Sequence, residues 1–103
     1  MKKVEILFNN IKAGILIENS RSDYEFIYDD SYIGLPISLT MPLKSKQFKY
    51  NFFPAFFEGL LPEGPQLEAL LNDKKINRDD LFSQLIACGA DCVGAVSIKE
   101  LNE

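Results

Sequence analysis

The sequence contains no histidine and no tryptophan, and it has only two cysteines among 103 residues. Without histidine, the commonest general base near neutral pH is missing. No serine or cysteine can therefore be activated by a histidine partner, and no Gly-x-Ser-x-Gly elbow occurs. Cys88 and Cys92 lack the histidine or second cysteine pair that a zinc site needs, so we expect them to be small buried thiols.

Other motifs that hold cofactors or cations are also missing. The six glycines are scattered and form neither a Walker loop nor a Rossmann fingerprint. The pairs Asp29-Asp30 and Asp79-Asp80 are the most concentrated carboxylates. Adjacent side chains point apart on a strand or a helix, so these pairs are typical of loops and helix caps rather than of a cation site. We expect no catalytic, cofactor or metal site, and hence a binding or regulatory module rather than an enzyme.

The charge balance narrows the class of partner. The net charge of −4 argues against direct nucleic-acid binding, which requires a positive field, and leaves an electropositive protein partner open. The one basic cluster, Lys44, Lys46 and Lys49, is expected to lie in an exposed loop. No apolar run approaches the roughly 18 residues of a membrane span, and the first residues turn polar too soon for a signal peptide. A cytoplasmic location is therefore expected.

The length fits one domain, residues 1–103. Alternating apolar and polar residues predict three strands at Lys3–Phe8, Ala13–Glu18 and Tyr24–Tyr28. Asn9 and Asn10 tolerate positive φ and predict a hairpin between the first two strands. A final strand is expected at Val93–Ile98, with Gly94 at its start, and Ile37–Met41 reads as a short strand or extended segment.

Helical spacing dominates the rest of the chain. We expect a short helix from Pro54 to Leu60, a second helix that starts near Pro65 and ends near Asn72-Asp73, and a third helix capped by Asp79 or Asp80 and stopped at Gly89. The predicted fold is therefore α+β, a small antiparallel sheet of an N-terminal meander plus a C-terminal strand, packed with about three short helices.

The most informative segment is residues 52–65, which contain four of the eight phenylalanines, three prolines and two glycines. A domain of this size needs Phe52, Phe53, Phe56 and Phe57 for its core. The turn that follows is expected to project from the helices as a partner interface, with apolar residues at its centre and an acidic rim. The interface residues predicted in this way are Glu58, Leu61, Pro62, Glu63, Gly64, Pro65 and Glu68.

Three segments, in the same order, resemble motifs of the N-terminal subdomain of the HipA family, which are bacterial serine/threonine kinase toxins. Residues 52–64 resemble its "N-F-F-x-N-L-L-P" type motif, and residues 36–43 resemble its "P-L-S-L-S-L-P-L" segment. Residues 80–96 resemble its "D-x-F-x-L-L-x-x-x-G-x-D-x-V-G-A-V" segment, in which Gly89, Asp91 and Gly94 are expected to form turns. The resemblance covers nearly the whole chain.

The resemblance implies a partner. A stand-alone copy of this subdomain is similar to the HipS family of three-component HipBST toxin–antitoxin systems, in which a shortened kinase, HipT, lacks the subdomain. In that family the small protein is an antitoxin that binds the kinase and suppresses its activity, and a helix-turn-helix repressor, HipB, binds the DNA. The resemblance leaves two other roles open: a structural complement of the kinase, and an accessory to the repressor.

One position departs from the family pattern. Stand-alone members tend to carry a large aromatic residue, usually tryptophan, after the Pro-Glu-Gly turn, and this side chain is proposed to plug the kinase active site. The matching position here is Pro65. Either Leu61 or Leu67 takes over the blocking role, or inhibition works differently.

Overall fold

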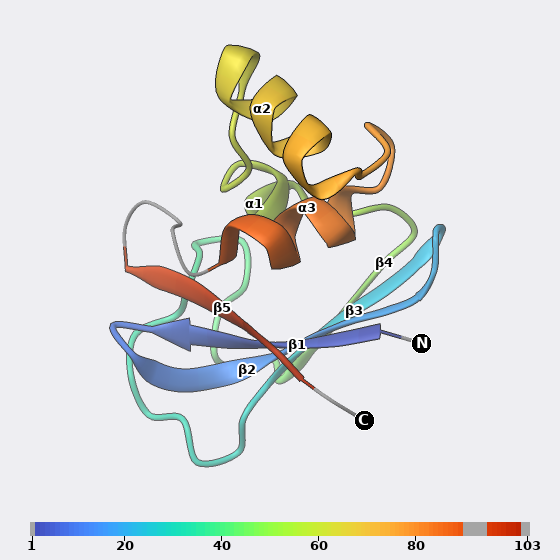
Figure 1. Cartoon of the computed structure of the whole chain (residues 1–103). Helices are drawn as coiled ribbons and strands as arrows, with labels where there is room; N and C mark the ends of the chain where they lie inside the picture. Colours follow the sequence, from blue (N-terminus) through green and yellow to red (C-terminus); the bar gives the residue numbers. More distant parts are fainter. Residues whose placement is uncertain (1, 90–94, 102–103) are drawn as a thin grey trace.

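The computed structural model describes residues 2–89 and 95–101, which form five strands and three helices. The strands are β1 (Lys2–Phe8), β2 (Ile11–Ser20), β3 (Asp23–Tyr28), β4 (Gln47–Tyr50) and β5 (Val96–Glu100). The helices are α1 (Ala55–Glu58), α2 (Gly64–Lys74) and α3 (Leu81–Cys88). The strands form one antiparallel sheet in the order β4-β3-β2-β1-β5, which confirms the predicted α+β fold (Figure 1).

The first hairpin forms as predicted. Asn9 and Asn10 have φ of 53° and 67°, and β2 begins directly after them. Positive φ at both central residues is the geometry of a tight hairpin turn, and asparagine tolerates it because its short polar side chain can bond locally. The turn fixes the register, in which Phe8 faces Ile11 and Val4 faces Leu16.

One face of the sheet is buried beneath the helices (Figure 1). Side chains alternate between the two faces of a strand, and the predicted alternation in β1 and β3 is confirmed. The buried face is made of Val4, Ile6, Leu16, Tyr24, Phe26, Tyr28, Val96 and Ile98. No helix among the described residues is long and apolar enough to pass through a lipid bilayer.

The prediction of an exposed basic loop through Lys49 is wrong at its end, because Gln47–Tyr50 forms β4 at the edge of the sheet. Phe48 and Tyr50 turn inward and are half-buried, whereas Lys49 faces solvent opposite Glu25. The side-chain amide of Gln47 also donates to Glu25, at 2.5 Å. Charged side chains on an edge strand hinder pairing with other chains, which accounts for lysine within a true strand.

The segment that joins β3 to β4, here called the β3–β4 loop (residues 29–46), contains no strand. The expectation of a strand or extended segment at Ile37–Met41 is therefore wrong. The backbone turns instead, with the Met41 amide donating to the Ser38 carbonyl at 3.1 Å. The Ser38 hydroxyl also accepts from the Thr40 amide at 3.2 Å. Serine and threonine hydroxyls compete for backbone groups in this way and favour turns over ladders.

Asp80 caps α3, as expected, by accepting hydrogen bonds from the Ser83 amide and hydroxyl at 3.1 and 2.7 Å. Gly89 ends the helix for a different reason from the expected one. Its φ is −56°, but a Cβ there would lie 2.6 Å from the Cβ of Ile98. Glycine is therefore needed because α3 approaches β5 closely. Of the predicted final strand, Val96–Ile98 is confirmed, and the strand continues to Glu100.

Several predicted features lie outside the described residues. They are the start of the final strand at Val93 and Gly94, the turn residue Asp91 and the thiol of Cys92. Cys88 is half-buried near the end of α3, with its thiol 3.6 Å from the carbonyl oxygen of Leu85.

The aromatic segment contributes to the core, but not with all four rings. Phe57 and Phe53 are buried and Phe56 is half-buried. Phe52 is 63% exposed, which corrects the prediction that it belongs to the core. The short α1 follows Pro54, so the backbone points Phe57 into the sheet and leaves Phe52 outside, where its ring contacts Tyr50 at 6.5 Å.

Replacement of Phe57 by alanine tests the role of this ring. Its complete burial predicts that Phe57→Ala lowers the free energy of unfolding by about 3–5 kcal/mol. Phe52→Ala is the matched control and should cost less than about 1 kcal/mol. Chemical denaturation measures both values. Equal losses would contradict the assigned burial.

Asp80 gives a prediction with a pH dependence. Burial raises the pKa of this carboxyl, but the two bonds from Ser83 and the charges of Lys2 and Arg21 outweigh it and hold the pKa below 3.8. A depressed folded-state pKa means that the stabilisation is present above the ordinary pKa and is lost as pH falls through the folded-state value. Asp80→Ala should cost about 1 kcal/mol at pH 7, as for other helix caps.

Urea denaturation from pH 7 to pH 2 should show the stabilities of the wild type and of Asp80→Ala converging in acid. The neighbouring exposed carboxylate provides the control, because Asp79→Ala should cost less than about 0.5 kcal/mol at any pH. A difference between wild type and Asp80→Ala that stays constant down to pH 2 would show that the charge of the cap contributes nothing.

Candidate partner-binding groove

The turn between α1 and α2 is built by consecutive backbone hydrogen bonds. The amides of Gly59, Leu60 and Leu61 donate to carbonyls three or four residues earlier, at 3.0–3.1 Å. The chain therefore keeps turning beyond Glu58, and both leucines pack back against the core. The helix α2 then begins at Gly64, whose φ is +60°. A side chain at Gly64 would have open space around it, so this glycine is required by its backbone conformation alone.

A groove opens between this turn, α2 and α3, with a volume of about 190 Å³. Its apolar lining consists of Leu61, Pro62, Leu67 and Leu81. The polar lining consists of Glu58, Glu63, Arg78 and Gln84. These eight residues define what is called the groove below.

Side-chain hydrogen bonds connect the elements that form the wall of the groove. The side-chain amide of Gln84, which is 1% exposed, donates to the carbonyls of Asn77 and Arg78 at 3.2 and 2.9 Å. Arg78 in turn donates to the Glu68 carboxylate of α2 at 2.7 Å. This charged hydrogen bond lowers the pKa of Glu68. The connection between α2 and α3 is therefore joined to α3 through Gln84 and to α2 through the exposed ion pair of Arg78 with Glu68.

The structure brings four of the seven predicted interface residues together. Glu58, Leu61, Pro62 and Glu63 line the groove. The side-chain carboxylates of Glu58 and Glu63 form no hydrogen bond or ion pair with another described residue, and both residues are exposed. Their carboxylates are therefore available to a partner.

The other three predicted residues lie beside the groove rather than in it. Gly64 and Pro65 form the exposed first turn of α2. Glu68 reaches the groove only through Arg78. Pro65 thus occupies the position where relatives were expected to carry a plugging aromatic ring, whereas Leu61 and Leu67 are half-buried and form the floor.

This arrangement suits an apolar protein side chain better than a small molecule. Small-molecule pockets usually measure about 300–1,000 Å³, which is more than the groove provides. A concave apolar floor with carboxylates at the edge matches the anatomy of protein interfaces, in which an apolar centre is surrounded by a polar rim. The groove is thus concave. Leu61 and Pro62 of the predicted turn are half-buried in it, whereas Glu63, Gly64 and Pro65 are exposed.

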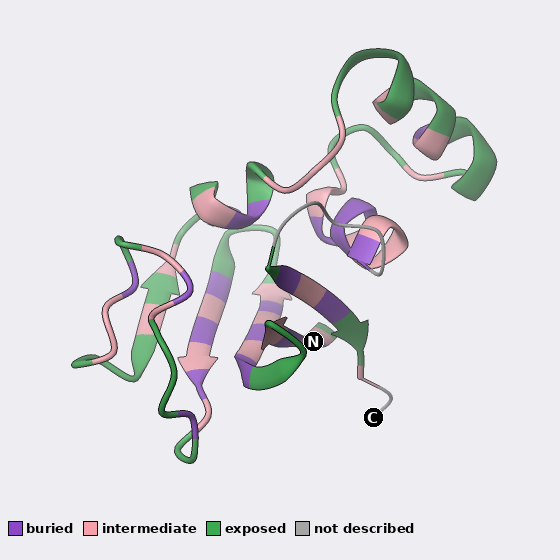
Figure 2. Ribbon diagram, turned by 90° about the vertical axis from the view of Figure 1, so that its left-hand side faces the viewer, coloured by how far each residue is buried: buried purple, intermediate pink, exposed green. Residues whose placement is uncertain are grey.

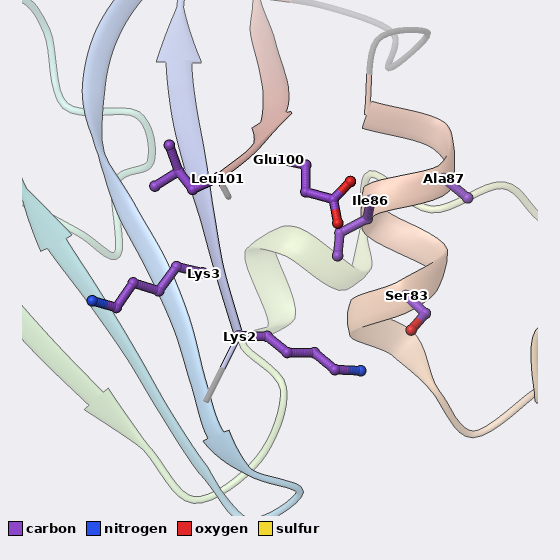
Figure 3. A pocket seen from close by; sticks show the side chains of 7 residues that line it. All are labelled: Lys2, Lys3, Ser83, Ile86, Ala87, Glu100 and Leu101. Atoms are coloured by element: carbon purple, nitrogen blue, oxygen red, sulfur yellow. The ribbon is translucent and has the colours of Figure 1, made fainter. Parts of the chain in front are cut away.

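A second cavity of about 430 Å³ lies between α3 and the strands β1 and β5 (Figure 3). Four of its seven lining residues are polar, namely Lys2, Lys3, Ser83 and Glu100. Figure 3 shows the Lys2 side chain directed toward α3, while Lys3 points to the other side of β1. The Ser83 hydroxyl, which also lines it, is already bonded to Asp80. Lys2, Ser83 and Glu100 thus bring polar groups to this cavity from β1, α3 and β5.

Four groove residues were not in the predicted interface. Leu67 was named only as an alternative blocking residue, and Arg78, Leu81 and Gln84 were missed. Leu81 has the helical spacing of a core residue, and its position at the groove follows from the way α2 and α3 cross. Arg78 stands next to an acidic cap in the sequence, where no local pattern reveals its partner ten residues earlier. These residues reach the groove through tertiary packing, and no local sequence pattern predicts their place there.

Comparison with known proteins places this geometry in a family. The model of the HipA N-terminal domain family matches residues 4–99. A protein of Haemophilus influenzae described as uncharacterized is 32% identical over 87 residues, covering 84% of this chain and 81% of the relative.

The fold is also shared with a solved structure, the N-terminal domain of HipA toxin. The two superpose with a TM-score of 0.79 and 22% identity, covering 100% of this chain and 95% of the other. At this identity the likeness establishes the fold. With the sequence match over residues 4–99, it shows that the chain belongs to the HipA N-terminal domain family.

Proposed function

We propose that the chain binds a HipA-like serine/threonine kinase of the HipT type and inhibits it, acting as the antitoxin of a toxin–antitoxin system without catalytic activity of its own. The groove is the proposed docking site. The observation that supports this most is an apolar receptacle with two uncommitted carboxylates, in a chain of this family.

The groove explains how a partner would be held. An apolar kinase side chain would enter between Leu61, Leu67 and Leu81, where the removal of apolar surface from water provides the affinity. Glu58 and Glu63 would face basic residues of the kinase and orient it. Inhibition then follows either by steric obstruction of the kinase cleft or by holding a kinase loop in an inactive position.

A second role is favoured by one specific observation. The structural relative is a domain of a HipA toxin, so this fold occurs as a part of a kinase toxin. A structural complement, which completes and stabilises a kinase that lacks the domain, would use the same groove. Co-expression separates the two roles: inhibition predicts that the kinase is toxic alone and harmless with the chain. A kinase that is soluble or active only with the chain would establish the complement instead.

A role as accessory to a HipB-like helix-turn-helix repressor is the third alternative. A gel-shift assay of operator DNA with the repressor, with and without the chain, decides it. The antitoxin proposal predicts no shift by the chain alone, in keeping with its net charge of −4.

Groove variants test the docking site directly. Leu61→Asp places a charge in the apolar floor and should weaken binding to the kinase at least tenfold, as expected for a central interface residue. Pro65→Asp, at the exposed edge, should weaken it less. Ala69→Asp is the matched control. Ala69 is an exposed residue of α2, the helix that contains Pro65, and this variant should bind like wild type. Isothermal titration with the kinase measures all three.

Thermal melts must show that each variant is folded before its affinity is compared. Because Leu61 is half-buried, Leu61→Asp can lose stability, and a Leu67→Asp variant provides a second perturbation of the same floor. Unchanged affinity in folded forms of both variants would exclude the groove as the docking site, even if the chain binds the kinase.

The carboxylates predict a dependence on ionic strength. The double variant Glu58→Gln/Glu63→Gln should reduce the association rate constant several-fold at low salt, because rim charges mainly steer encounter. At high salt the two rate constants should converge, since the Debye length falls to about 3 Å at 1 M. Stopped-flow mixing provides the rates. A wild-type rate without any salt dependence would show that these carboxylates do not face a charged partner surface.

A further inference from the structure

Three aliphatic side chains of the β3–β4 loop stand in solvent. Leu39 is 97% exposed, Ile33 is 95% exposed and Leu35 is 72% exposed. Ile11, on the neighbouring hairpin, is 63% exposed. Single apolar residues on a surface are ordinary, but several gathered on one segment indicate an interaction site.

The β3–β4 loop is held in place because three of its residues are buried in the core. Tyr32, Ile37 and Met41 are all buried. The Tyr28 hydroxyl accepts from the Ile37 amide at 3.1 Å and donates to the Met41 carbonyl. These anchors fix the backbone around Leu39, so its exposure is imposed by the fold. Figure 2 shows the same alternation, with buried and exposed stretches following one another along the loop.

The loop also forms a concave surface. A cavity of about 230 Å³ is lined by Phe8, Ile11, Tyr32, Ile33 and Leu35, together with the polar residues Asn9 and Ser31. Its lining is mostly apolar. A cavity of this size can accept a side chain of a protein partner, and the exposed aliphatic side chains next to it can fit into a depression on that partner.

The groove alone is too small for a specific complex. A stable interface buries about 800 Å² on each partner and involves roughly 20–30 residues a side. The groove has eight lining residues, of which half are polar. A kinase bound there with useful affinity must therefore cover further surface of the domain. The exposed aliphatic side chains of the β3–β4 loop are the largest group of exposed apolar residues in the described part of the chain, and Phe52 lies apart from them in sequence.

The two surfaces can face one partner. In Figure 1 the segment between α1 and α2 lies left of centre near the top, and the β3–β4 loop lies below it at the left and bottom. Figure 2 shows both from the same side, with the segment at the upper right and the loop at the lower left, so a shared partner would span the length between them. They are joined through the core by ring contacts, from Phe57 to Phe26 at 5.8 Å and from Phe26 to Tyr28 at 4.9 Å. Their relative placement is therefore fixed before a partner arrives, which lowers the entropy cost of binding.

We infer that Ile33, Leu35 and Leu39 of the β3–β4 loop form a second docking surface for the same HipA-like kinase, engaged together with the groove. This inference rests on the proposed function. A single kinase molecule spans both surfaces, the loop contributes apolar area, and the groove contributes the charged rim and orientation.

The test uses the full chain and a HipA-like kinase of the same genome that lacks its own copy of this domain. Leu39→Asp and Ile33→Asp should each weaken binding at least tenfold, because a charge would be buried without a partner. Both side chains are almost wholly exposed, so the melting temperatures should stay near that of wild type. Asn72→Asp, which adds the same charge at an exposed site of α2, should leave the affinity unchanged.

The outcomes separate the two proposals. If Leu61→Asp weakens binding and both loop variants bind like wild type, the second surface is refuted and the groove stands. If wild type does not bind the kinase at all, the proposed function and this inference both fall. Analytical ultracentrifugation tests whether a second copy of the chain binds the loop instead. If wild type is a dimer and Leu39→Asp is a monomer with unchanged kinase affinity, the loop serves self-association and the second docking surface is refuted.

Discussion

The positions of the candidate surfaces depend on the two hydrogen bonds that the Tyr28 hydroxyl makes to the backbone of the β3–β4 loop. This hydroxyl lies in the core at the end of β3 and bonds two backbone groups of the β3–β4 loop, from Ile37 and Met41. The ring beneath it contacts Phe26, which in turn contacts Phe57 of α1. A buried hydroxyl must be hydrogen-bonded, so the loop cannot leave this position without a cost of about 1–3 kcal/mol. The aromatic cluster of Tyr28, Phe26 and Phe57 thus positions both the β3–β4 loop and α1, which precedes the turn that lines the groove.

The elements that form most of the core differ from the helix α2, which lies mostly outside it. The sheet and α3 supply most of the buried side chains, whereas α2 buries only Leu71 and packs against α3 (Figure 2). A helix with so little burial gains little stability from its position. Its contribution is to form one wall of the groove, fastened by the ion pair between Arg78 and Glu68. The helix that contributes least to the core, α2, thus forms one side of the groove, whereas the β3–β4 loop is held by its own buried residues Tyr32, Ile37 and Met41.

Local patterns predicted the parts of the fold that local physics controls. The Asn9-Asn10 turn, the alternation of β1 and β3 and the Asp80 cap each depend on neighbouring residues. β4 was missed because Lys49 follows Lys44 and Lys46 in a sequence that resembles a loop, although at the sheet edge Lys49 faces solvent. The groove was half predicted: the residues of the turn are continuous in sequence, but Arg78 and Leu81 reach it only through the crossing of α2 and α3. Of the exposed loop residues, Leu39 lies in the segment Ile37–Met41 that resembled a strand, and the Tyr28 hydrogen bonds to Ile37 and Met41 show why the backbone turns there.

The most direct test of the account is hydrogen–deuterium exchange of the chain with and without the HipA-like kinase. Amide exchange reports local opening and protection by a partner, segment by segment. The account predicts slower exchange in two segments, residues 58–67 and residues 31–41, and unchanged exchange in the C-terminal half of α2. Protection confined to β5 or the outer face of the sheet, or no protection at saturating kinase, would contradict the claim that these two surfaces bind the kinase.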